Sequence, residues 1–109
     1  MATTKFNPYD GSWELAGSDW ECTYNPFTKG WRYAPPGASA KYNPYNGGWE
    51  LAGKNWRVTY SPYTGDWKYC PPDSSARYNP YSGSWELAPS TWAISYNPHT
   101  GKWAYAPTD

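Results

Sequence analysis

The stretch Tyr96-Asn97-Pro98-His99-Thr100-Gly101-Lys102-Trp103 decides the fold of this 109-residue chain. Asparagine before proline caps a turn with its side chain, proline presets φ at the next position, and glycine takes the left-handed position. Tyr96 and Trp103 then face each other across two strands and pack together. The stretch therefore predicts a tight β-hairpin.

This hairpin recurs along the whole chain. Tryptophan returns every 18 residues, at Trp13, Trp31, Trp49, Trp67, Trp85 and Trp103. A second series has twice that period and comprises Trp20, Trp56 and Trp92. The two series predict one repeat domain, residues 1–109, built from 36-residue repeats at 6–41, 42–77 and 78–109.

The charges predict the register of the hairpins. If Tyr42 faces Trp49, Lys41 faces Glu50, and the equivalent pairs are Lys5 with Glu14 and Arg77 with Glu86. Opposite charges in all three repeats favour this register, and each pair is expected to form a cross-strand ion pair. In the same scheme the indoles share one face of the sheet, and the charged residues form its exterior.

The fold class predicted is all-β. A four-residue turn, Ala52-Gly53-Lys54-Asn55, would place Leu51 opposite Trp56 and join two hairpins into a four-stranded antiparallel meander. Three meanders would close around a pseudo-threefold axis, as in a β-prism, a β-trefoil or a propeller. The alternative is an open, single-layer hairpin solenoid. Because the chain has few aliphatic residues, we expect aromatic rings to form the core.

Composition excludes several classes of protein. The 12 prolines and 10 glycines leave no segment for a long helix. The net charge of zero argues against a nucleic-acid partner or an anionic membrane surface. No apolar run has the length of a signal peptide or of a membrane-inserted segment, so a cytoplasmic location is expected by default.

The residue after each turn proline is the candidate ligand-binding position. Turns usually carry a small polar residue there, whereas this chain carries Tyr9, Phe27, Tyr45, Tyr63, Tyr81 and His99. Rings at turn tips can stack on the apolar face of a sugar while nearby polar groups bind its hydroxyls. Alternatively, they pack on the neighbouring hairpin.

Two resemblances support a hairpin array. The turns at Tyr60–Trp67 and Tyr96–Trp103 resemble the designed hairpin chignolin. The array as a whole resembles the choline-binding repeats of bacterial cell-wall-binding proteins, which also use short hairpins with two tryptophans and a tyrosine. That resemblance implies aromatic cages for a quaternary ammonium, but the proline turn is foreign to those repeats, and glycine precedes tryptophan only at Trp31 and Trp49.

Enzyme chemistry finds no support in the sequence. His99 is the single histidine, and no nucleophile–base set, phosphate-binding loop or metal-ligand spacing is present. We therefore expect no catalysis, no cofactor and no metal. Cys22 and Cys70 occupy unrelated positions in their repeats, which favours free thiols over a disulfide.

Three functions remain open from the sequence. The first is multivalent carbohydrate binding through the turn tips, with glycans or another polymeric surface ligand as partner. The second is a structural or assembly repeat of a fibre or surface layer, for which homo-oligomers would form. The third is a cell-wall module that binds choline or another quaternary ammonium.

Overall fold

The computed structural model describes residues 3–108, and in that range every regular element is a β-strand. The predicted all-β class is therefore confirmed. The twelve strands pair in sequence into six antiparallel hairpins, which we number 1 to 6 along the chain. Hairpins 1 to 3 are β1 (Thr3–Asn7) with β2 (Ser12–Ala16), β3 (Glu21–Asn25) with β4 (Gly30–Ala34), and β5 (Ser39–Asn43) with β6 (Gly48–Ala52). Hairpins 4 to 6 are β7 (Arg57–Tyr60) with β8 (Trp67–Cys70), β9 (Ser74–Asn79) with β10 (Ser84–Pro89), and β11 (Ala93–Asn97) with β12 (Lys102–Ala106).

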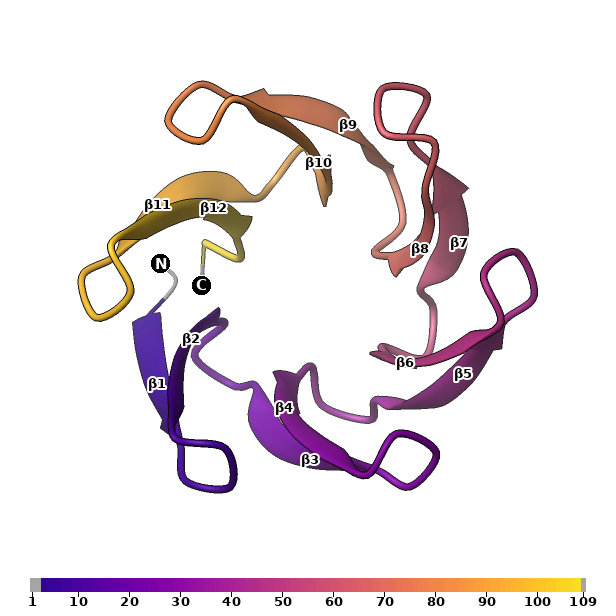
Figure 1. Cartoon of the computed structure of the whole chain (residues 1–109), viewed down its shortest axis with the longest axis vertical. Helices are drawn as coiled ribbons and strands as arrows, with labels where there is room; N and C mark the ends of the chain where they lie inside the picture. Colours follow the sequence, from indigo (N-terminus) through magenta and orange to yellow (C-terminus); the bar gives the residue numbers. More distant parts are fainter. Residues whose placement is uncertain (1–2, 109) are drawn as a thin grey trace.

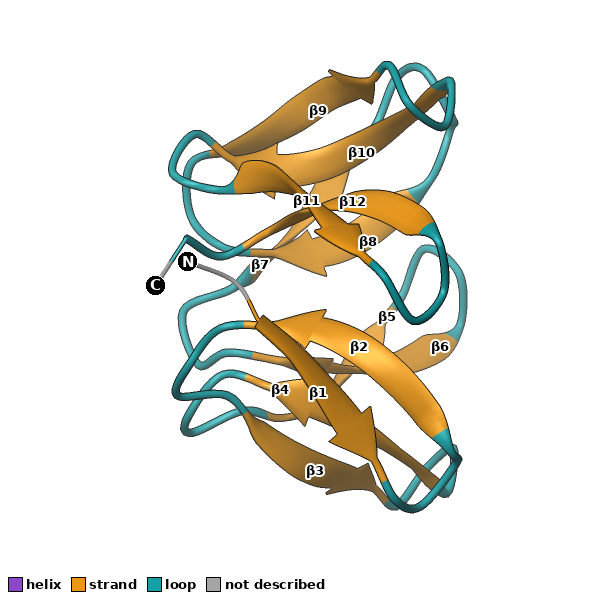
Figure 2. Cartoon of the chain, turned by 90° about the vertical axis from the view of Figure 1, so that its left-hand side faces the viewer, coloured by secondary structure: helices purple, strands orange, loops and turns teal. Residues whose placement is uncertain are grey.

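The hairpins stand in a ring around a central axis (Figure 1). The even-numbered strands line the inside of the ring and the odd-numbered strands lie outside. Figure 2 shows the turns gathered on one side of the disc and the segments between hairpins on the other. The ring is closed by contacts between hairpins 6 and 1: Asn97 Nδ2 donates to the Trp13 carbonyl at 3.1 Å, and His99 stacks on Trp13.

The register predicted from the charges is confirmed. Tyr42 pairs with Trp49 and Lys41 with Glu50, and the same pairing recurs in hairpins 1 and 5. The side chains, however, take other partners: Lys41 Nζ donates to the carbonyls of Gly53 and Lys54, at 2.8 and 3.0 Å. Glu50 instead accepts hydrogen bonds from Asn43 and from the backbone of Tyr69. Lys41 thus holds the segment after β6, and Glu50 holds the following hairpin.

The predicted four-stranded meanders are wrong, because each sheet contains two strands. Leu51 pairs with Ala40 and not with Trp56. The Trp56 amide donates to the Gly53 carbonyl at 3.1 Å, which closes a turn. From there the chain crosses from the inner strand β6 to the outer strand β7 of the next hairpin (Figure 1). Consecutive hairpins therefore pack face to back, and β6 and β7 do not meet edge to edge.

Face-to-back packing also corrects the expected charged exterior. The face that carries Trp49 meets the preceding hairpin, where Phe27 stacks on it. The face that carries Glu50 meets the following hairpin at Tyr69. Both faces of a hairpin are thus covered in the ring, and the polar face supplies hydrogen bonds to its neighbour.

The buried core is built from small side chains, whereas the sequence predicted aromatic rings. An alanine or cysteine at the end of each inner strand, or one residue before it in β10, is at most 4 % exposed: Ala16, Ala34, Ala52, Cys70, Ala88 and Ala106. The residue before each turn proline is at most 5 % exposed: Asn7, Asn25, Asn43, Ser61, Asn79 and Asn97. Two-stranded sheets packed face to back leave room only for small side chains between them, so none of the aromatic rings in residues 3–108 is fully buried.

Two turns depart from the repeated pattern. Lys29 takes the glycine position of hairpin 2 with φ of 65°, and its amide still donates to the Asn25 carbonyl. The turn therefore keeps its geometry, with a residue that carries a Cβ held in the left-handed region. Ser61 replaces asparagine in hairpin 4, and its buried hydroxyl has no hydrogen-bond partner among residues 3–108.

Candidate functional site

The turn fixes the position of each tip ring before any packing occurs. In hairpin 3, Asn43 Oδ1 accepts a hydrogen bond from the Tyr45 amide at 3.0 Å, and the Gly47 amide donates to the Asn43 carbonyl at 2.8 Å. Gly47 has φ of 75°, which glycine adopts without strain. The predicted turn chemistry is therefore confirmed, and it directs the tip side chain toward the next hairpin.

Each tip ring stacks on the repeat tryptophan of the following hairpin. The ring centroids are 3.7–4.0 Å apart and the planes differ by 5–12°. The pairs are Tyr9 with Trp31, Phe27 with Trp49, Tyr45 with Trp67, Tyr63 with Trp85, Tyr81 with Trp103, and His99 with Trp13. The interpretation that tip rings pack on a neighbour is thus confirmed for all six.

Stacking covers one face of each tip ring and leaves the other in solvent. The four tyrosines at turn tips are each 59 % exposed, and Phe27 is 55 % exposed. The second face of each tryptophan meets a ring of its own hairpin, at 4.9–5.3 Å and 42–56°. Six aromatic trios therefore surround the disc, and in each of them the tip ring offers a free face.

A buried asparagine of the preceding hairpin supports five of the six trios by donating to the backbone carbonyl of their tryptophan. Asn43 Nδ2 donates to the Trp67 carbonyl at 2.8 Å and to Glu50 Oε2 at 2.8 Å. Glu50 Oε1 accepts from the Tyr69 amide at 3.0 Å, and the Tyr69 hydroxyl donates to the Tyr42 carbonyl at 2.7 Å. Equivalent bonds join hairpin 1 to 2 and hairpin 5 to 6. The odd-to-even junctions are thus the most densely hydrogen-bonded ones.

Polar side chains lie beside a tip ring at the junction of hairpins 3 and 4. A cavity of about 570 Å³ there is lined by Tyr45, Asn46, Glu50, Gly65, Asp66, Trp67 and Lys68. Asn46 Oδ1 accepts from the Gly48 amide at 2.8 Å, and this bond leaves the amide NH₂ of Asn46 able to donate. The site thus combines two stacked rings with an amide, carboxylates and an ammonium group.

A carboxylate also follows the tip ring of hairpin 1. Asp10 Oδ1 accepts from the hydroxyl and the amide of Ser12, at 2.6 and 2.9 Å. The bond from the Ser12 hydroxyl, followed by that from the Ser12 amide, lowers the pKa of Asp10. Asp10 is therefore an ionised hydrogen-bond acceptor beside Tyr9 at neutral pH.

The cysteines do not contribute to this site. Both are free thiols, and Cys70 is buried at the end of β8. Burial raises the pKa of Cys70 to about 11. Burial is also the main cause that raises the pKa of Cys22. Neither thiol is thus activated as a nucleophile.

Among residues 3–108, no group of three or more His, Cys, Asp or Glu side chains is placed to hold a metal ion. The same residues include no helix of the length and apolarity that a membrane crossing requires.

Comparison of the chain with family models, with curated proteins and with solved structures finds no match. The resemblance to choline-binding repeats therefore stays a prediction from the sequence.

Sequence reasoning located the tip rings but missed the groups around them. Asn46 belongs to hairpin 3, whereas Asp66 and Lys68 belong to hairpin 4, and their convergence depends on face-to-back packing, which the sequence did not predict. It also missed a second, central cavity. The sequence signal for this cavity is the series of tryptophans that recur every 36 residues. The predicted turn at 52–55 made Trp56 the first residue of a strand, whereas β7 begins at Arg57.

Proposed function

We propose that the protein is a non-catalytic, multivalent carbohydrate-binding protein that holds sugars on the outer faces of its tip rings. The observation that carries this proposal is the one-sided stacking of the tips. Tyr45 lies 3.9 Å from Trp67, centroid to centroid, yet 59 % of its surface is exposed. A ring that is immobilised on one face and free on the other is a preformed platform for a pyranose.

The preformed platform matters because sugar binding is weak. Association has to offset the entropy of ordering flexible side chains, and a ring already fixed by stacking avoids most of that cost. Polar groups next to an apolar platform then select the orientation of a ligand. Asn46 and Asp66 lie beside Tyr45 and offer donor and acceptor groups for sugar hydroxyls.

The ring arrangement favours binding to a polymer. We further infer a propeller-like organisation, in which a pseudo-threefold axis relates three hairpin pairs. The turns lie on one side of the disc (Figure 2), so several tips can meet the same polysaccharide surface. Weak sites that engage together reach a useful avidity.

The geometry gives less support to the two other functions. Trp49, a typical candidate for an ammonium cage, has one face on Phe27 and the other toward Tyr42. A fibre of stacked hairpins needs free ends, whereas hairpin 6 meets hairpin 1 through Asn97 and Trp13. Neither observation favours these functions over sugar binding.

The test is binding to a broad glycan array and to insoluble polysaccharides. We expect Tyr45→Ala together with Tyr81→Ala to weaken binding, because two platforms are removed. The matched control is Tyr42→Ala with Tyr78→Ala: these rings are 47 % and 46 % exposed and also contact tryptophans, but they are not at turn tips.

His99→Tyr is expected to strengthen polysaccharide binding, because position 99 is the turn tip that carries no phenyl or phenol ring. His99 stacks on Trp13 at 3.8 Å, so His99→Tyr would keep the stack and enlarge the platform. Stronger polysaccharide binding by this variant would support the proposal. A folded protein that binds nothing on a wide panel, or control variants that lose as much binding as the tip variants, would refute it.

A further inference from the structure

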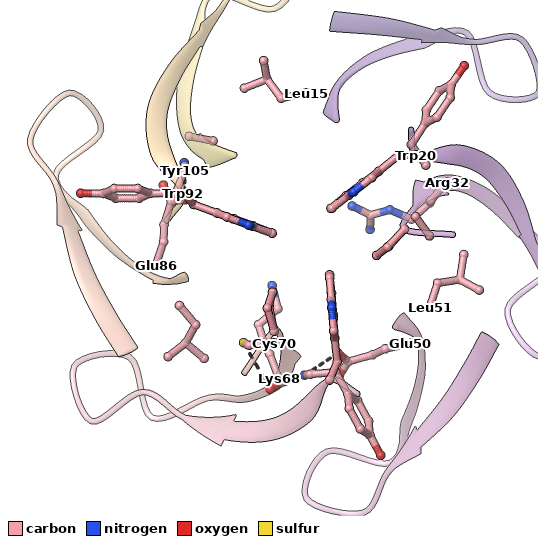
Figure 3. Close-up of a pocket in the computed structure, with 18 of the residues that line it drawn as sticks. Leu15, Trp20, Arg32, Glu50, Leu51, Lys68, Cys70, Glu86, Trp92 and Tyr105 are labelled. Atoms are coloured by element: carbon pink, nitrogen blue, oxygen red, sulfur yellow. Dashed lines mark hydrogen bonds between the residues drawn. The ribbon is translucent and has the colours of Figure 1, made fainter. Parts of the chain in front are cut away.

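A second cavity lies on the axis of the ring, away from the outer faces of the tips. It has a volume of about 850 Å³, within the range of about 300–1,000 Å³ that is usual for small-molecule sites. Its lining comes from all three repeats (Figure 3). It reaches from the central tryptophans, beside the segments between hairpins, to Thr28 and Thr64 at the turns.

The inner end of this cavity is apolar. Trp20, Trp56 and Trp92 meet there with centroids 5.9–6.3 Å apart and planes inclined by 57–64°. Such distances and angles are those of rings in tilted or edge-to-face contact, so the three indoles pack on one another. The equivalent leucines of the three repeats, Leu15, Leu51 and Leu87, extend the apolar wall. A flat apolar body would therefore find matching surface here.

Two cationic residues, both exposed, also line the cavity. Arg32 and Lys68 occupy the position that glutamate holds in the odd hairpins, and the third even hairpin has Ala104 there. The structure assigns no hydrogen bond or ion pair between either side chain's charged group and residues 3–108. Figure 3 shows Arg32 beside Trp20, with its guanidinium directed toward the middle of the cavity. Hairpin 6 has the uncharged Ala104 at the equivalent position and still packs in the ring, so ring formation does not require a positive charge there.

The acidic groups of the lining are arranged differently. The Glu50 carboxylate accepts from Asn43 Nδ2 at 2.8 Å and from the Tyr69 amide at 3.0 Å. Glu86 has the same two kinds of donor, from Asn79 and Tyr105. Their charges are thus used in joining hairpins, and Asp66 lies at the turn end, just before β8. The cations are the charged groups left to meet a ligand near the tryptophans.

We propose that the axial cavity binds one organic anion with a flat apolar body, such as an aromatic or alicyclic carboxylate or sulfonate. Its rings lie against the indoles and leucines, and its charged group pairs with Arg32 and Lys68. Guanidinium groups bind such anions through two parallel hydrogen bonds, and a lysine adds a point charge. This inference does not rest on sugar binding at the tips, although Glu50, Asp66 and Lys68 line both cavities.

The probe is anilinonaphthalene sulfonate, a fluorescent anion with a flat apolar body, titrated into the folded protein. Phenylnaphthylamine, which has the same rings without the sulfonate, is the neutral comparison. We expect one sulfonate dye per chain and a dissociation constant that rises about tenfold or more in Arg32→Ala/Lys68→Ala. The neutral dye should bind this double variant as it binds the original protein.

Two variants control for net charge and for folding. Lys54→Ala/Lys102→Ala removes two positive charges elsewhere and is expected to leave dye affinity nearly unchanged. Ala104→Arg adds the third cation and is expected to tighten binding of the sulfonate dye alone. The inference is overturned if the sulfonate dye does not bind, or if the two double variants weaken it equally. It is also overturned if charge at positions 32, 68 and 104 has no effect on its affinity.

Discussion

Ser61→Asn is expected to stabilise the protein, because it restores the asparagine that every other turn carries. The Ser61 hydroxyl is buried and has no hydrogen-bond partner in the described part of the chain, residues 3–108. At the equivalent place in hairpin 2, Asn25 Nδ2 donates to the Trp49 carbonyl at 3.1 Å, and Asn25 Oδ1 accepts from the Phe27 amide at 3.0 Å. The substitution would supply the matching bonds to the Trp85 carbonyl and from the Tyr63 amide.

The magnitude follows from these contacts. Two hydrogen bonds contribute about 0.5–1.5 kcal/mol each, and removing an unpaired buried hydroxyl relieves about 1–3 kcal/mol. Ordering the longer side chain costs about 1 kcal/mol. The free energy of unfolding is therefore expected to rise by about 1–5 kcal/mol, and the melting temperature by about 4–8 °C for each kcal/mol.

The assay is urea denaturation followed by tryptophan fluorescence, together with thermal melting followed by circular dichroism. Asn25→Ser is the reverse control and should lose a similar free energy. If Ser61→Asn leaves the free energy of unfolding unchanged or lowers it while Asn25→Ser is destabilising, the reasoning about the junction of hairpins 4 and 5 is refuted.

Two further predictions concern the backbone and pH. Lys29→Gly should raise the free energy of unfolding by about 1 kcal/mol, because Lys29 has φ of 65° and a left-handed conformation strains a residue with a Cβ. Equal urea midpoints for the variant and the original protein would contradict this prediction. Cys70 has its pKa raised to about 11 by burial, so above pH 9 the unfolded chain releases the thiol proton first and stability falls between pH 9 and 11. Cys70→Ala, which installs the alanine of Ala34 and Ala106, should flatten this part of the pH profile relative to the original protein; superimposable profiles would show that the thiol is not the cause.

Local features of the fold could be predicted from the sequence because they depend on neighbours along the chain. The pairing of Tyr42 with Trp49 and the left-handed glycine at Gly47 both follow from one turn. The charge pattern gave the correct register for Lys41 and Glu50 as well. These features need no knowledge of how the hairpins pack.

The relation between hairpins could not be predicted in the same way. Lys41 and Glu50 looked like a surface ion pair, but each bonds to a different segment because the hairpins pack face to back. Asn43 looked like a turn cap, and it is also the bridge to the Trp67 carbonyl of the next hairpin. A backbone carbonyl has no signature in the sequence, so these second partners and the grooves between hairpins emerge only from the three-dimensional arrangement.

The contact between His99 and Trp13 tests the closed ring most directly. These residues belong to the last and first hairpins, and their rings stack with centroids 3.8 Å apart and planes 10° from parallel. His99 is the single histidine of the chain, so its imidazole protons are readily assigned by NMR. A closed ring predicts strong nuclear Overhauser effects between His99 and the Trp13 indole, with imidazole resonances shifted upfield by the stacked ring. Imidazole shifts of a solvent-exposed histidine without such effects would contradict closure.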